Sequence, residues 1–243
     1  MRAAAALLTA GNVHLRFGAL VVLDGVDFSV GPSEAVGVVG PNGAGKTSLL
    51  NILAGAYRPA AGIVRFDGHE VTRLPAAERC RLGIGRSHQI PRPFSGMTVL
   101  ENLVAAATHG GGLRGTAAGK RCVQVLELCR MTILANRRAD SLGLLDRKRL
   151  EMARALCTGP RLLLLDEIGG GLTDGEAAQL VEMILEIRRQ GIALVWIEHI
   201  VHVLLQVVDR LVCMDAGRVI AGGRPREVLE SADVIDAYIG GRA

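Results

Sequence analysis

The chain has 243 residues, of which 49% are hydrophobic and only 3% aromatic, and its formal net charge is +4. This length is enough for one large or two small domains with a substantial core. The scarcity of aromatic side chains and the scattered basic residues argue against stacking platforms and basic stripes for nucleic acid, so we expect no nucleic-acid partner. The five cysteines form no C-x-x-C pair and indicate reduced thiols in a cytosolic protein.

The N-terminal third has the alternating pattern of strands, which turn signals interrupt. Residues 12–30 alternate between apolar and polar side chains, with turn signals at Gly18 and Asp24-Gly25. Asp67-Gly68 lies between two further apolar runs and is typical of a hairpin turn. We therefore expect antiparallel strands in this part of the chain. The apolar opening of the sequence is too short for a signal peptide, and no run reaches the roughly 18 apolar residues of a membrane span.

A glycine-rich motif interrupts this layer. The strand-like run Ala35–Val39 leads into Gly40, Pro41, Asn42, Gly43, Ala44, Gly45, Lys46, Thr47 and Ser48. The first eight of these fit G-x-x-x-x-G-K-[ST], and an apolar helical pattern follows and ends at Gly55. Such a run between a strand and a helix gathers backbone N–H groups around an anion. We expect these nine residues to bind a nucleoside triphosphate, with Lys46 at the β- and γ-phosphates and Thr47 at Mg²⁺.

The middle of the sequence favours helices. Thr98 and Glu101 have the spacing of a capping box. The segment 109–119 contains five glycines and is the best candidate for a mobile linker. Helical patterns follow over 120–134 and from about 146 to 156. These features predict an inserted helical lobe over 90–158, with Gln89 directly before its first residue.

The last third alternates between strands and helices. Strand-like runs at 162–165, 192–197 and 211–214 are separated by helical patterns at 177–189 and 201–208, which predicts a parallel sheet. The first run ends in Asp166-Glu167 and the second is followed by Glu198-His199, so we expect these side chains at one sheet edge. Asp166 would hold Mg²⁺, Glu167 would polarise a water, and His199 would donate to the γ-phosphate. A helix-capping acid pair and a structural edge histidine are the alternatives, and position alone leaves Gln89 undecided.

Together these motifs resemble those of ATP-binding cassette ATPases over nearly the whole chain. The resemblance rests on Gly40–Thr47 (Walker A), Gln89 (Q-loop), Asp166-Glu167 (Walker B) and His199 (H-loop). It implies an α/β fold, in which a P-loop NTPase (RecA-like) core carries an antiparallel β-subdomain and an inserted α-helical subdomain. The implied single domain spans 1–243, with its core in 1–89 and 159–243 and its helical insertion in 90–158.

The resemblance also implies roles for individual residues. Catalytic roles fall to Glu167, His199, Gln89 and Lys46, and Mg²⁺ contacts to Thr47, Gln89 and Asp166. Phe17 matches the aromatic side chain that stacks on adenine in this family, although by pattern alone it would be a core residue. Within a dimer, the signature region of one chain contacts the ATP of the other.

Finer features resemble the branched-chain amino acid uptake branch of the family. They are the segments Arg86–Phe94, Met97–Leu103 and Val234–Gly240. This branch implies the ATPase subunit of an importer for branched-chain amino acids or a related small solute, placed in the cytoplasm on the inner face of the membrane. Its implied partners are integral-membrane permeases, a second ABC ATPase and a periplasmic or surface solute-binding protein. An exporter-type ATPase for lipid or polysaccharide, a soluble non-transport cassette and a phosphate-loop kinase are the alternatives.

The signature region departs from the family pattern. Leu142, Gly143, Leu144, Leu145 and Asp146 stand where the family has Leu-Ser-Gly-Gly-Gln. The serine hydroxyl is missing, and Leu145 prevents the close backbone approach that glycine permits. We therefore expect a heterodimer with one efficient and one weak ATP site, with a homodimer as the alternative. The basic run Arg147–Arg149 would face either an anionic partner group or solvent.

Overall fold

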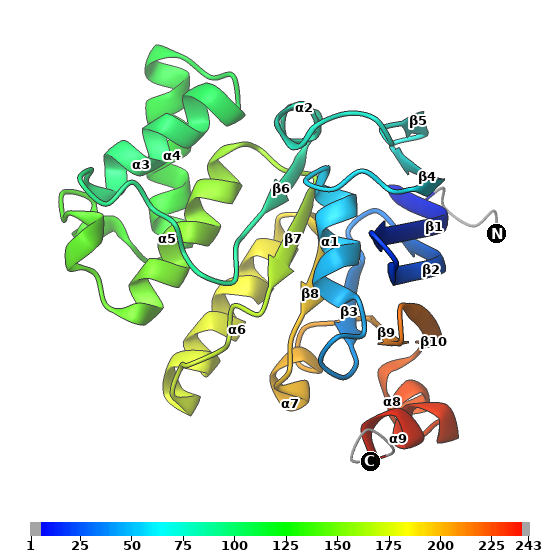
Figure 1. Ribbon diagram of the computed structural model, residues 1–243. Coiled ribbons are helices and arrows are strands. Elements are labelled where there is room, and N and C mark those ends of the chain that lie inside the picture. Colours follow the sequence, from blue (N-terminus) through cyan, green and yellow to red (C-terminus); the bar gives the residue numbers. More distant parts are fainter. Residues whose placement is uncertain (1–5, 240–243) are drawn as a thin grey trace.

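The computed structural model describes residues 6–239; the start of the apolar opening, residues 1–5, and the last residue of the family-like tail, Gly240, lie outside that part. A sheet with the strand order β10-β9-β3-β8-β7-β6 forms the centre of the described chain (Figure 1). Its strands are β3 (Ala35–Val39), β6 (Ile84–Arg86), β7 (Leu162–Asp166), β8 (Ala193–Ile197), β9 (Arg210–Asp215) and β10 (Arg218–Gly223). All pairings are parallel except that of β10 with β9. The predicted parallel sheet is confirmed.

A second, antiparallel sheet has the order β2-β1-β4-β5 and lies beside the first (Figure 1). Its strands are β1 (Leu8–Phe17), β2 (Leu20–Val30), β4 (Ala61–Phe66) and β5 (His69–Glu70). The turn between β4 and β5 has φ 52° at Asp67 and 77° at Gly68. Two central residues with positive φ give the turn whose twist suits a tight hairpin. The hairpin predicted at Asp67-Gly68 is therefore confirmed.

The central sheet is buried on both faces by two separate apolar clusters. Leu163 and Leu165 of β7 belong to a cluster with α5 (Leu144–Cys157) and α6, whereas Leu162 and Leu164 belong to one with α1 and the antiparallel sheet. Burial of alternate side chains on opposite faces explains why the parallel strands are continuous apolar runs. The helices outside the segment between β6 and β7 are α1 (Lys46–Ala54), α2 (Ala76–Leu82), α6 (Asp174–Arg189), α7 (Val201–Leu204), α8 (Pro225–Leu229) and α9 (Ala232–Ile239).

The segment between β6 and β7 forms a group of helices to one side of the sheets (Figure 1). It comprises α3 (Val99–Ala105), a π-helical turn (Ala106–Gly110), α4 (Gly115–Leu128), two 3₁₀ turns (Thr132–Leu134 and Ala139–Ser141) and α5 (Leu144–Cys157). The capping box at Thr98 is confirmed: the Thr98 N–H donates to Glu101 at 2.7 Å and the Glu101 N–H donates to the Thr98 hydroxyl at 3.2 Å.

Three predictions of local structure were wrong in extent. The expected linker over 109–119 is largely helical, because α4 begins at Gly115 and the π-helical turn reaches Gly110. An added Cβ at Gly110 would lie 2.6 Å from Thr158 Cγ2, so this glycine permits close packing. The helix expected to reach residue 134 ends at Leu128, near Arg130 with its φ of 56°. The helix expected over 201–208 extends only to Leu204.

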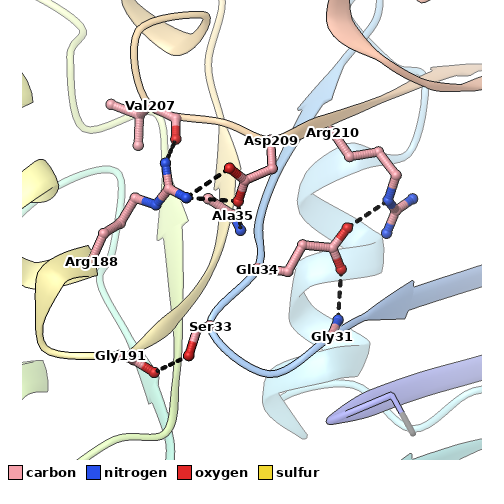
Figure 2. Close-up of polar contacts among 9 residues, drawn as sticks. All are labelled: Gly31, Ser33, Glu34, Ala35, Arg188, Gly191, Val207, Asp209 and Arg210. Atoms are coloured by element: carbon pink, nitrogen blue, oxygen red, sulfur yellow. Dashed lines mark hydrogen bonds and ion pairs between the residues drawn. The ribbon is translucent and has the colours of Figure 1, made fainter. Parts of the chain in front are cut away.

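The amino ends of the parallel strands are joined by ion pairs and backbone contacts (Figure 2). The Arg188 guanidinium, on α6, donates to both Asp209 oxygens at 2.7 Å, and the same carboxylate accepts from Ala35 N–H at 2.9 Å. Beside it, Glu34 accepts from Arg210 Nε at 2.8 Å. These contacts fix the starts of β3 and β9 against the end of α6.

A further buried cation, Arg79, joins α2 to the end of α1. The Arg79 guanidinium, on α2, donates to the carbonyls of Ile52 and Leu53 in the last turn of α1 at 2.6 and 3.0 Å. Burial lowers the pKa of Arg79 to about 10, so the guanidinium stays charged at neutral pH. A positive charge at the carboxyl end of a helix is favourable. Among residues 6–239, no helix has both the length and the apolar character needed to cross a membrane.

Candidate functional site

The glycine-rich loop lies between β3 and α1, in the strand–loop–helix context that the sequence predicts. Gly40 has a φ of 141°, and an added Cβ there would lie 2.0 Å from the Met214 carbonyl oxygen of β9. Only glycine fits this close approach. Lys46 begins α1, and its buried ammonium donates to the carbonyls of Gly40 and Pro41 at 2.7 and 2.8 Å. Burial lowers the pKa of Lys46, and the carboxylates of Glu167 and Asp166 oppose that shift.

Asp166 ends β7 and faces the first turn of α1. The Thr47 hydroxyl donates to Asp166 Oδ1 at 3.4 Å, and Arg86 Nη2 lies 3.4 Å from Asp166 Oδ2. Burial raises the pKa of Asp166, while the Arg86 charge opposes the shift. A hydroxyl and a carboxylate so close together are the oxygen ligands that Mg²⁺ takes, so Thr47 and Asp166 fit this ion.

Glu167 gathers two other predicted residues around its carboxylate. Gln89 Nε2 donates to Glu167 Oε2 at 2.5 Å, and His199 Nε2 lies 2.9 Å from Glu167 Oε1. β7 and β8 pair in register up to Asp166 and Ile197, which places the residues after both strands at one edge of the sheet. Glu167 itself has a φ of 46°, a conformation that is costly for a residue with a side chain and that clusters at functional sites. Gln89 thus lies beside Glu167 at this edge. Its contact with Mg²⁺ stays a prediction.

The sequence analysis assigned no role to two residues of this edge, Glu198 and Arg86. Glu198 is buried, and its carboxylate accepts the N–H groups of Gly169 and His199 at 2.5 and 3.2 Å. It therefore fixes both the loop after Glu167 and the backbone of His199, although burial raises its pKa. Arg86 ends β6 and joins Asp166 to Asn51 of α1, whose Oδ1 accepts from Arg86 Nη1 at 2.6 Å. An acid directly after an apolar strand was the available signal for Glu198.

Phe17 lies at the end of β1 and is half exposed, so the alternative of a core residue is wrong. Its ring meets that of Tyr57 edge to face, with centroids 5.5 Å apart. Tyr57 was not predicted. The two rings are nearly perpendicular, so a planar group could stack on the face of one ring and not on the pair. Adenine stacking on Phe17 stays a prediction.

The signature region caps α5. Gly143 precedes the helix, Leu144 is 44% exposed, and Asp146 Oδ1 accepts from Arg149 Nη1 at 3.1 Å. Arg149 also donates to Gln179 of α6 at 2.7 Å. An acid that is already paired inside the chain thus occupies the first turn, where a helix would otherwise favour an external anion.

The basic run after the signature is largely buried. Lys148 and Arg149 are 4% and 9% exposed, so a solvated basic face is wrong for these two residues, and only Arg147 is exposed. Burial lowers the pKa of Lys148, and the charges of Glu198 and Glu167 oppose that shift. The first turns of α5 are therefore tied electrostatically to the edge that carries Glu167.

Comparisons with known proteins agree with this geometry. The family model described as "ABC transporter" matches residues 23–169. The chain is 35% identical to the high-affinity branched-chain amino acid transport ATP-binding protein BraF of Pseudomonas aeruginosa, covering 96% of this chain and 98% of that one. It is 34% identical to the high-affinity branched-chain amino acid transport ATP-binding protein LivG of Escherichia coli K12. This match also covers 96% of this chain and 98% of that one.

Solved structures of ATP-binding cassettes also resemble this chain. A nucleotide-free ATP-binding cassette from an ABC transporter superimposes with a TM-score of 0.88 at 31% identity, covering 97% of this chain and 99% of that one. The ADP conformation of the cassette MJ1267 gives a TM-score of 0.87, with the same identity and coverage. The predicted P-loop NTPase fold is confirmed. The chain belongs to the ABC transporter family, as one of its ATP-binding cassettes.

Proposed function

We propose that this cassette is the ATP-hydrolysing subunit of an importer for branched-chain amino acids or a related small solute. One observation carries the ATPase assignment: the Glu167 carboxylate is contacted by Gln89 and His199 at the sheet edge that also carries Asp166, Thr47 and Lys46. The solute class rests on relatives whose names state branched-chain amino acid transport, at 34–35% identity over nearly the full chain.

The roles of the residues follow from their placement. Gly40–Ser48 form the phosphate site, in which backbone N–H groups after Pro41 and the Lys46 ammonium bind the phosphates, and Phe17 stacks on the adenine. Glu167 accepts a proton from the attacking water, which Gln89 helps to orient, and the His199 ring donates to the γ-phosphate. Thr47 and Asp166 hold Mg²⁺, which when bound offsets the negative charge of the transferred phosphoryl group. Gln89, which donates to Glu167, would also contribute to binding Mg²⁺.

The segment 90–158 serves as the helical subdomain that faces the membrane partner, while 1–89 and 159–243 form the catalytic core. Apolar side chains follow Gln89: Ile90 is 70% exposed, Phe94 48% and Met97 41%. Exposed apolar side chains that gather in one segment mark interaction sites. This segment would contact the permeases and carry the nucleotide state to them through Gln89. The chain would then sit on the cytoplasmic face of the membrane, with a solute-binding protein on the opposite side.

The cassette would pair with a second, different ATPase. Leu144, Leu145 and the internally paired Asp146 leave its signature unsuited to the γ-phosphate of a partner, whereas its own Lys46 and Glu167 are in place. One site of the heterodimer would therefore hydrolyse ATP well and the other poorly.

Restoration of the signature tests this asymmetry. The double variant Gly143→Ser and Leu145→Gly should raise turnover of the assembled complex, because the second site would then contribute. Gly143 accepts the serine without strain, since its φ is −67° and nothing lies within 4 Å of an added Cβ. Unchanged turnover in the assembled complex would contradict the asymmetry. Leu145→Gly alone is the matched control, because it lacks the hydroxyl.

The transport assignment is tested by co-purification. The tagged chain is isolated from detergent-solubilised membranes, and the proteins bound to it are identified by mass spectrometry. Recovery of polytopic permeases and a second ATPase with an intact signature supports the importer. Recovery of ribosomal, DNA-repair or cluster-assembly proteins alone would favour a soluble cassette. Uptake of labelled leucine by cells lacking the chain, restored by the natural sequence and not by Glu167→Gln, separates an importer from an exporter.

A further inference from the structure

The first residue of the phosphate loop is held from outside the loop by the C-terminal helix. The Gly40 N–H donates to the Tyr238 hydroxyl oxygen at 2.9 Å, although the two residues are 198 positions apart in the chain. The carbonyl of Gly40 accepts from Lys46 Nζ at 2.7 Å. Gly40 is thus bound through its N–H by α9 and through its C=O by the lysine proposed to bind phosphate.

The position of Gly40 makes this contact important. Its backbone is buried and pressed against β9, where an added Cβ would overlap the Met214 carbonyl oxygen. A buried N–H without an acceptor is unfavourable, so the loop needs a partner for this group if it is to keep its conformation. Within residues 6–239, the Tyr238 hydroxyl is the acceptor that the structure gives to this N–H.

The helix α9 also packs against α8 and β10. Val234 is buried in the apolar cluster that also contains Val228 of α8, and the helix lies against β10. Ile235 is 43% exposed on the same helix. Apolar packing therefore attaches the helix, and the Tyr238 hydroxyl is a separate polar connection from it to the loop.

We propose that Tyr238 is a positioning residue for nucleotide binding, which holds Gly40 and through it the Lys46 ammonium in the geometry that accepts phosphate. The C-terminal helix would thereby set the affinity of the cassette for ATP and ADP. This role rests on the proposed phosphate-binding function of Gly40–Thr47.

The variant Tyr238→Phe tests the role, because it removes the hydroxyl and keeps the ring. Kd values for fluorescent ADP and ATP analogues are measured by titration, together with KM and kcat of the assembled ATPase. We expect Kd and KM to rise roughly 2- to 10-fold, the effect of one hydrogen bond, with kcat within about twofold. Ile235→Ala, at an exposed position of the same helix whose side chain has no polar group to bind the loop, should leave all three unchanged. Unaltered Kd values in Tyr238→Phe, even with a lower Tm, would overturn the role.

Reciprocity gives a second measurement that does not depend on turnover. If α9 favours nucleotide binding, bound nucleotide must stabilise α9 to the same extent. Saturating ADP should therefore slow amide hydrogen exchange in residues 232–238 of the natural chain, and this protection should be lost in Tyr238→Phe. Unchanged exchange in the ADP-bound natural chain would overturn the role of Tyr238 alone. Failure of the natural chain to bind either nucleotide would instead refute the phosphate-loop function, and the role of Tyr238 with it.

Discussion

Replacement of Glu167 by glutamine separates the chemical role of this side chain from its structural one. Glu167 is 18% exposed as a side chain and accepts from both Gln89 Nε2 and His199 Nε2. A glutamine has nearly the same shape but offers one oxygen and one NH₂ group. Gln89 can donate to the remaining oxygen, and the new NH₂ group can donate to His199 Nε2 when that ring carries its proton on Nδ1, so the variant loses at most one of the two contacts.

The two effects differ in size. Loss of one partly exposed hydrogen bond costs about 1 kcal/mol, which lowers the Tm of a chain of this length by roughly 2–4 °C. Loss of a general base lowers the rate by roughly 100- to 10,000-fold, or about 3–5 kcal/mol in activation free energy. We therefore expect a nearly inactive protein that folds and binds ATP almost normally.

Phosphate release at saturating MgATP gives kcat, a fluorescent ATP analogue gives Kd, and thermal denaturation gives Tm. Glu182→Gln is the matched control, since Glu182 is an exposed acid on α6 that pairs with Arg130. It should retain full turnover. A Glu167→Gln variant that keeps more than about a third of the natural kcat would refute the role of this carboxylate. A loss of ATP binding that matches the loss of turnover would refute the separation of chemistry from binding.

Two further predictions concern the folded state. Arg79→Met should lower the free energy of unfolding by roughly 3–4 kcal/mol and Tm by about 10 °C, because four backbone carbonyls lose a charged donor. The exposed control Arg81→Met should change both quantities little. Calorimetry measures both. A Tm loss below about 3 °C would show that water replaces the guanidinium. A thiol reagent at pH 8 should modify Cys80 quickly and the other four cysteines only after denaturation, because they are buried and burial raises the pKa of Cys129 to about 12 and of Cys213 to about 11. Rapid reaction of a second thiol in the native protein would contradict this packing.

The sequence was most informative where local pattern and tertiary contact agree. β7 and β8 are uniformly apolar because both faces of the sheet are covered, and their ends coincide with the residues expected to carry the chemistry. The start of α4 was missed for the opposite reason. Glycines in 109–119 look like a linker in the sequence, but Gly110 packs against Thr158 and Gly115 begins a helix that buries Ala118 and Cys122.

The candidate site likewise has a part that the sequence predicts and a part that it does not. Gln89, Glu167 and His199 come together because β7 and β8 are neighbours and β6 lies next to β7. Residues that act through long-range contacts carry no local signal: Tyr238 meets Gly40 across 198 positions, and Arg86 meets Asp166 across 80. Neither pairing follows from spacing, because each depends on where separate elements dock on the sheet.

The two edges of the central sheet explain how one fold combines rigidity with reactivity. At the amino ends of the strands, Arg188 and Asp209 form complete ion pairs that also bind the backbone of β3 (Figure 2). At the carboxyl ends, Glu167 has a left-handed backbone and Asp166 a buried carboxylate, both unfavourable by themselves. Such groups persist only when the surrounding structure holds them, which Arg86 and Glu198 do from either side. Under the proposed function, the groups held at this edge are those that would carry out ATP hydrolysis.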